Sequence, residues 1–133
     1  MNTQITSKSE IKKELETMQV FLESVVDDDP GIAVSYGNDA LVYYSRSGKL
    51  LADAKMHKDR KLRSELVEQI KVISGLSASV ANKFIDTLTE EENYLVNWAD
   101  RINAALARRA DFCRTMISKA KEEMRLTQIS QQS

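Results

Sequence analysis

The sequence predicts an all-α fold made of long antiparallel helices. Glycine and proline are scarce, with four Gly and one Pro in 133 residues, whereas sheet folds need many turns that are rich in both. Apolar residues also recur at spacings of three and four over long stretches, which is the period of an amphipathic helix. A chain of this length corresponds to one domain.

The first helix is predicted over residues 8–27. Ser7 and Glu10 have the Ser-x-x-Glu spacing of a capping box, in which two side chains bind free N–H groups at a helix start. One apolar stripe follows, formed by Ile11, Leu15, Met18, Leu22 and Val25. The Asp-rich run 27–31, which ends in Pro-Gly, should stop this helix. Residues 1–6 are polar and are expected to be disordered.

The second helix is predicted over residues 34–74. A strict heptad forms its seam, and after the basic run the pattern resumes in a new phase. Gly37 and Gly48 either allow another helix to approach closely or, for Gly37, lie in the turn before the helix; Gly75 fits a helix stop. The seam consists of Tyr36, Ala40, Tyr43, Ser47, Leu50, Ala54 and His57, followed by Leu62, Leu66, Ile70 and Ile73.

Two further helices are predicted over residues 79–87 and 89–126. Ser77 or Ser79 can cap the first, and Thr89 with Glu92 has the spacing of a second capping box. The last seven residues, 127–133, are polar and are expected to be disordered. The apolar stripe of the last helix consists of Leu95, Ala99, Ile102, Leu106, Ala110, Cys113, Ile117, Ala120 and Met124.

A helix over residues 89–126 would be roughly 57 Å long at 1.5 Å per residue. One small globule cannot cover such a stripe. The stripe therefore needs an equally long partner, which is either the 34–74 helix folded back or another subunit, with coiled-coil-like packing. We expect a homo-oligomer.

The charge balance excludes a globally basic nucleic-acid binder, because the net charge is −1 and the pI is about 5.9. The charge alternates in blocks, with acidic residues in excess over 1–31 and 76–100 and basic residues in excess elsewhere. A single cysteine rules out an intrachain disulfide. No leader-like or membrane-spanning apolar run is present in the sequence, so we expect a cytoplasmic location without membrane contact.

The residues that could carry enzyme chemistry are few. Ser45–Lys49 resembles a phosphate loop, but the first glycine and the magnesium-binding hydroxyl are missing. The acidic runs 27–29 and 90–92 lack the spacing of calcium or di-metal ligands. His57, the only histidine, and Cys113 both fall on apolar stripes, where structural roles are expected. The sequence therefore predicts no enzyme activity, no metal and no cofactor.

The densest positive charge lies in the run 55–63, which predicts contacts with phosphates. Nearby tyrosines could stack on bases. A solvated helix face, or attraction between oppositely charged blocks of two subunits, would explain the same charges. The residues concerned are Lys55, Lys58, Arg60, Lys61 and Arg63, with Tyr36, Tyr43, Tyr44 and Trp98, and a second basic series at Arg101, Arg108, Arg109, Arg114, Lys119, Lys121 and Arg125.

The order of these elements resembles that of small helical proteins of tailed phages and prophages. An acidic segment precedes an aromatic helix at 36–51, the basic run follows, and a second long helix carries Trp98 and Asp111-Phe112-Cys113. Over residues 32–126 the pattern is most similar to the recombination mediator family of T4-like phages. The resemblance implies a helical oligomer that binds single-stranded DNA and helps to load a recombinase. The resemblance also implies that Arg46 and Lys49 belong to the basic stretch that binds DNA.

Two functions follow as hypotheses. The first is a non-enzymatic accessory protein of phage or mobile-element DNA metabolism that binds single-stranded nucleic acid and a partner protein. Its binding residues would be Tyr43, Tyr44, Arg46, Lys49, Lys55, Lys58, Arg60, Lys61 and Arg63. The second is a scaffolding or virion assembly module that acts only through protein–protein contacts.

Overall fold

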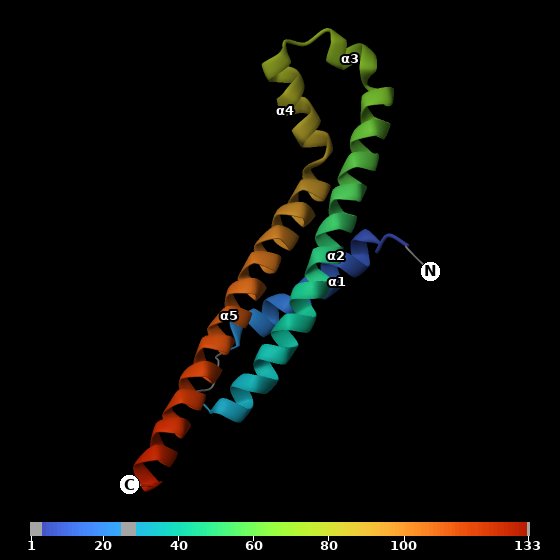
Figure 1. Ribbon diagram of the computed structural model, residues 1–133. Coiled ribbons are helices and arrows are strands. Elements are labelled where there is room, and N and C mark those ends of the chain that lie inside the picture. The colour runs from blue at the N-terminus through green and yellow to red at the C-terminus, as the bar shows by residue number, and fades with distance from the viewer. Residues whose placement is uncertain (1–3, 25–28, 133) are drawn as a thin grey trace.

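The computed structural model describes residues 4–24 and 29–132 of the chain. It is 91% helical, and its described residues contain no strand, which confirms the all-α prediction. The helices are α1 (Lys8–Glu23), α2 (Pro30–Glu68), α3 (Ile70–Ser74), α4 (Ala78–Leu88) and α5 (Glu90–Gln132). Figure 1 shows that α2 and α5 run antiparallel as a long hairpin, with α3 and α4 at its closed end.

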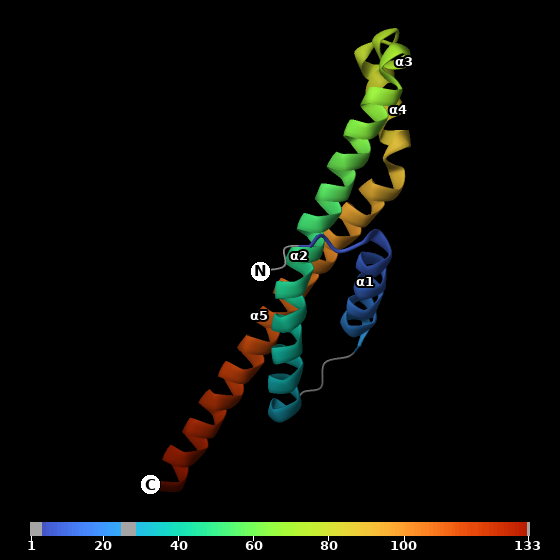
Figure 2. The same ribbon diagram turned by 90° about the vertical axis from the view of Figure 1, so that its right-hand side faces the viewer.

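The short helix α1 covers one face of this hairpin. Figure 2 views the hairpin from its edge, with α1 on one side and no described element on the other. The last turns of α5 extend past the start of α2 and end without a neighbour in either view. The partner that the long apolar stripe requires is therefore supplied by α2, as one of the two predicted alternatives.

The end of α1 and the start of α2 differ from the prediction, whereas the start of α1 agrees with it. The Ser7 side chain accepts a hydrogen bond from the Glu10 N–H, so the predicted start of α1 is confirmed. However, α1 ends at Glu23, and the predicted continuation over 25–27 lies outside the described residues. Helix α2 starts at Pro30, four residues early, because Asp29 caps Gly31 N and Ile32 N. An Asp N-cap followed by Pro at the first position is a helix start rather than a stop.

The second predicted helix is divided at Gln69 into α2 and α3. At the next boundary Ser77, not Ser79, caps α4 by accepting from Val80 N. The expected capping box at Thr89 is wrong, because the Thr89 hydroxyl donates to Ile85 O at 3.1 Å instead. Glu92, which was expected to complete this capping box, instead pairs with Lys8 of α1. The expected disorder of 127–132 is also wrong, since α5 continues to Gln132, while residue 133 lies outside the described residues.

The core lies in the middle of the hairpin, where α1, α2 and α5 meet. The α5 stripe is buried as far as Cys113 and becomes exposed beyond it. Gly37 lies within α2, and a Cβ atom there would be 3.1 Å from the Cys113 Cβ, which confirms the close helix approach. No described residue over 62–88 or 114–131 is buried. The central cluster is formed by Ile11, Leu15, Met18, Leu50, Ala54, Leu95, Ala99, Ile102 and Leu106.

Candidate functional site

Three of the predicted phosphate-binding cations are engaged within the chain. Arg46 donates from Nε and Nη2 to the two carboxylate oxygens of Glu14 on α1, at 2.8 Å each. This contact raises the pKa of the Arg46 guanidinium. Lys61 forms an ion pair with Glu65 at 3.0 Å, one turn along α2. Arg46 joins α1 to α2, whereas the Lys61 pair lies within α2. Both cations already have a carboxylate partner, so they are poorly placed for a phosphate.

Lys49, the third of these cations, belongs to a small network around Asp53. Its Nζ donates to both carboxylate oxygens of Asp53, at 2.6 and 2.8 Å, and to the Gln4 carbonyl. The backbone N–H of Thr6 also donates to Asp53 at 2.9 Å. Burial raises the pKa of Asp53, but the hydrogen bonds from Lys49 and Thr6 outweigh it and leave the pKa below its usual value.

The same network fixes the segment before α1. The Thr6 carbonyl lies 2.7 Å from His57 Nε2, so a hydrogen bond ties the lone histidine to this segment. Residues 4–6 are therefore held against α2, contrary to the expected disorder, while 1–3 lie outside the described residues. No local sequence pattern predicts this contact, because the partners are about fifty positions apart.

The two predicted stacking tyrosines have different surroundings. Tyr43 is half-buried and packs edge-on against Phe21, with ring centroids 5.0 Å apart. Tyr44 is exposed and lies on a different side of α2. Tyr36, which the sequence also offered, stacks on Phe21 at 4.3 Å. Of these three rings, only Tyr44 presents a face that a ligand could reach.

Four of the predicted cations make no hydrogen bond or ion pair within the described part of the chain. They are Lys55, Lys58, Arg60 and Arg63, all on α2 beyond its contact with α1. Successive residues of a helix turn by about 100°, so these four point in different directions rather than toward one site. The structure thus separates the nine predicted binding residues into a packed group and an accessible group.

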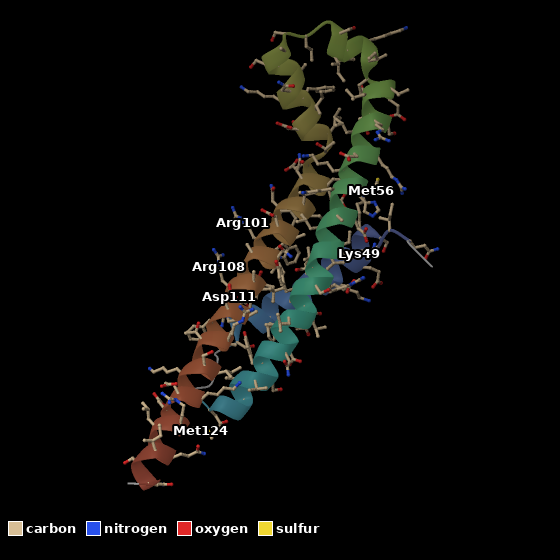
Figure 3. The ribbon with its side chains drawn as sticks, viewed as in Figure 1. Lys49, Met56, Arg101, Arg108, Asp111 and Met124 are labelled. Carbon is tan, nitrogen blue, oxygen red and sulfur yellow. The ribbon has the colours of Figure 1, made fainter. Side chains whose placement is uncertain are left out.

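The second basic series, on α5, is divided in the same way. Arg109 donates to Leu22 O at 3.0 Å and lies over the Tyr36 ring, so it fastens α1 to the hairpin. Arg114 pairs with Asp111, and Arg125 pairs with Glu122. Figure 3 shows Arg101 and Arg108 extending from the same side of α5, away from α2.

A buried ion pair that the sequence did not indicate joins α1 to the start of α5. Lys8 Nζ lies 2.9 Å from a carboxylate oxygen of Glu92, whose side chain is almost fully buried. The hydrogen bond that Lys8 donates to Glu92 raises the pKa of Lys8 despite partial burial. The capping-box spacing pointed to Glu92, but it suggested the wrong partner.

The remaining candidates for chemistry have structural surroundings. Burial raises the pKa of the Cys113 thiol, which makes the nucleophilic thiolate scarce. Ser45–Lys49 is part of α2 and not a loop. Among the described residues, no group of three or more His, Cys, Asp or Glu side chains is placed to hold a metal ion. None of the described helices is long and apolar enough to cross a membrane.

We compared the chain with protein-family models, with curated proteins and with solved structures, and none of them matches it. The resemblance to the phage recombination mediators therefore stays a prediction.

Proposed function

We propose that the protein is a non-enzymatic helical binding protein that acts through contacts with other proteins. The observation that supports this proposal is the closed end of the hairpin, residues 62–88, where apolar residues recur but none is buried. Val67, Ile70, Val72 and Val80 are 76, 58, 50 and 49% exposed. Apolar side chains gathered at one end of a molecule are typical of a surface that a partner covers.

The surroundings of the reactive side chains also support a binding role. His57 hydrogen-bonds to a backbone carbonyl, and Cys113 is packed against Gly37 between the two long helices. A nucleophile and a base would have to lie within hydrogen-bond reach of each other, whereas these two residues belong to different parts of the hairpin. Binding and scaffolding need only the exposed helix surfaces and no such pair of side chains.

A crosslinking experiment in cells that naturally produce the protein tests this role. A photoreactive amino acid is placed at Val67 or Val72, and at the exposed polar Asn82 of α4 as a matched control. We expect both apolar positions to capture the same second protein and Asn82 to capture much less of it. Equal capture at all three positions, or none at the apolar ones, would contradict the proposal.

A second candidate function is the binding of single-stranded nucleic acid in phage or mobile-element DNA metabolism. The observation that favours it is that four cations of α2 lack a partner in the described chain, while Tyr44 is exposed. Lys55 and Lys58 follow Tyr44 by eleven and fourteen residues, about three and four helical turns, so the three lie on one side of α2. A backbone bound along this side could meet both charges and a ring.

Fluorescence anisotropy with a labelled single-stranded oligonucleotide tests this second function. Each phosphate contact contributes about 0.7 to the slope of log affinity against log salt. Replacing Lys55, Lys58, Arg60 and Arg63 by Ala should therefore weaken binding and flatten the slope, while replacing the exposed Lys12 and Lys13 of α1 should change neither. Binding that is absent, or equally salt-sensitive in both variants, would exclude this site.

The two tyrosines refine the same experiment. Tyr44→Ala should cost about 1–3 kcal/mol of binding free energy if a base stacks on the ring. Tyr43→Ala should instead lower the free energy of unfolding, because this ring packs on Phe21. The reverse pattern would mean that the packed ring is the ligand contact.

A further inference from the structure

The face of the hairpin away from α1 has the surface of a helix-packing seam. On α2 it presents an uninterrupted alternation of three- and four-residue steps, which is the heptad spacing of a coiled coil. This outer seam is adjacent to the buried seam and one residue later in sequence. It consists of Val34, Gly37, Leu41, Tyr44, Gly48, Leu51, Lys55 and Lys58.

Most apolar residues of the outer seam are exposed in the described chain, although Leu51 packs against the central core cluster. Val34, Leu41 and Tyr44 are 43, 50 and 41% exposed, and Leu51 is half-buried. At the lower end of the seam, Val34, Gly37 and Leu41 line a groove of about 230 Å³ together with Ala110, Cys113 and Ile117 of α5. Asn38, Arg114, Ser118 and Lys121 also line the groove, so a partner helix would meet both apolar and polar side chains there.

Gly48 gives an independent indication that another backbone approaches this seam. A glycine in a helix interior costs about 1 kcal/mol relative to alanine, so its presence in mid-α2 requires a reason. Within the chain there is none, because a Cβ atom at this position would meet only Asn103 Nδ2, at an ordinary 3.9 Å. Gly37, in contrast, is required by the close contact with Cys113.

The total surface of the chain also indicates a large interface. It exposes 9298 Å², whereas a compact monomer of 15.0 kDa exposes about 7,000 Å². The excess of about 2,300 Å² is larger than the roughly 800 Å² that each partner buries in a standard stable interface. A second copy covering one face of the hairpin would remove surface of this order.

We propose that the outer seam of α2 packs against the outer seam of a second copy of this chain, in antiparallel orientation about a twofold axis. In one register every seam position meets a complementary one: Leu41 lies opposite Leu51 of the second copy, and Tyr44 lies opposite Gly48, so that the ring fills the space which glycine leaves. The same pairs occur twice, as a twofold interface requires.

The lysines at the two ends of the seam favour an antiparallel pair. Lys55 and Lys58 of one copy would lie over Gly37 and Val34 of the other, near the start of its α2. Arg114, which is paired with Asp111, and Lys121 line the same groove. Long lysine stems can cover apolar surface while their ammonium groups stay in water. A parallel arrangement would place the lysines of the two copies side by side.

This proposal is separate from the contacts proposed for the closed end of the hairpin, since it uses another face. It does compete with nucleic acid for Lys55 and Lys58, which cannot serve both partners at once. Loss of crosslinking at Val67 would therefore leave the twofold seam unaffected, and loss of the seam would leave that end unaffected.

Sedimentation equilibrium of the full chain tests the proposal. We expect a particle of twice the 15.0 kDa chain mass at micromolar concentrations. Leu41→Glu and Leu51→Glu should each raise the dissociation constant at least tenfold. Val42→Glu is the matched control, because Val42 is 68% exposed, neighbours Leu41 and lies off the seam. A wild-type monomer, or a dimer that Val42→Glu weakens as much as Leu41→Glu, would overturn the proposal.

A disulfide experiment tests the register without placing a charge in the seam. Chains with Leu41→Cys are mixed with chains with Leu51→Cys, while the buried Cys113 stays in place. Mild oxidation should join the two kinds of chain at least several times more efficiently than it joins like chains. Preferential joining of two Leu41→Cys chains would show a parallel pair, and no joining would show that this face does not pack on itself. Either result would overturn the proposal.

Discussion

At the scale of single residues, Asp53 links α2 to the segment before α1. It accepts hydrogen bonds from Lys49 on its own helix and from the Thr6 N–H before α1, and it is almost fully buried. An acceptor in this position holds the N-terminal segment on α2. Its loss would leave the Thr6 N–H and the Lys49 ammonium without their partner, which costs more than the net value of one hydrogen bond.

We therefore expect Asp53→Asn to lower the free energy of unfolding by about 1–3 kcal/mol at neutral pH. The pKa of Asp53 is lowered on folding, so its stabilisation is present above the ordinary carboxyl pKa and is lost as the pH falls through the folded value. The difference between wild type and variant should shrink in acid. Urea unfolding at neutral and acidic pH measures this.

Asp59→Asn is the control for that experiment, because Asp59 is exposed on the same helix. It should change stability little at either pH. A stability difference for Asp53→Asn that stays constant from neutral to acidic pH would contradict the role of the ionised carboxylate.

The residue types of the candidate site could be read from the sequence, but their partners could not. The basic character of 55–63 was predictable, but nothing in the sequence separates the exposed Tyr44 from the packed Tyr43. The engagement of Arg46 by Glu14, and of Tyr43 by Phe21, depends on where α1 lies. That position is set by contacts between residues that are distant in the chain, for which a single sequence has no signal.

At the scale of elements, the end of α5 has no packing partner in the described chain. Figure 3 places Met124 on the part of α5 that extends past α2, where it is 62% exposed. Residues from 121 to 131 are all exposed. This extension is helical because adding a residue to an existing helix is far easier than starting one, not because it packs.

Removal of residues 122–133 should therefore leave the free energy of unfolding within about 0.5 kcal/mol of wild type. Removal of residues 1–6 is the contrasting variant, and it should destabilise the chain because Thr6 bonds to Asp53 and His57. Thermal unfolding followed by circular dichroism compares the two. A large loss on removal of 122–133 would show that the extension packs on something, in the same chain or another copy.

Helix existence was predictable for four of the five helices, but several ends were not. The heptad of α2 and the apolar stripe of α5 predicted these two helices and the faces that they bury in the middle of the hairpin. The sequence predicts that Asp29-Pro30 ends the first helix, whereas in the structure these residues begin α2. The same residue types favour both turns and helix N-termini. The polar tail after Leu126 has no apolar period, yet its three Gln residues are good helix formers and α5 continues through it without packing.

At the scale of the whole molecule, the chain is a hairpin with a core in its middle and uncovered surface elsewhere. The matching apolar stripes of α2 and α5 predict the hairpin. They do not say which of its two faces α1 covers, because both faces carry apolar residues. The face left open is the one with Gly48, and this explains a glycine that the single chain does not need.

The central claim is that two copies lie side by side through this open face, and small-angle X-ray scattering tests it most directly. The stretch from Ala78 to Gln132 is roughly 80 Å long at 1.5 Å per residue, and the proposed twofold axis crosses α2 between Tyr44 and Gly48, near the middle of the hairpin. We predict that the particle has twice the chain mass but a maximum dimension close to that of one hairpin. A particle of one chain mass, or a dimer nearly twice as long and joined at its ends, would contradict the account.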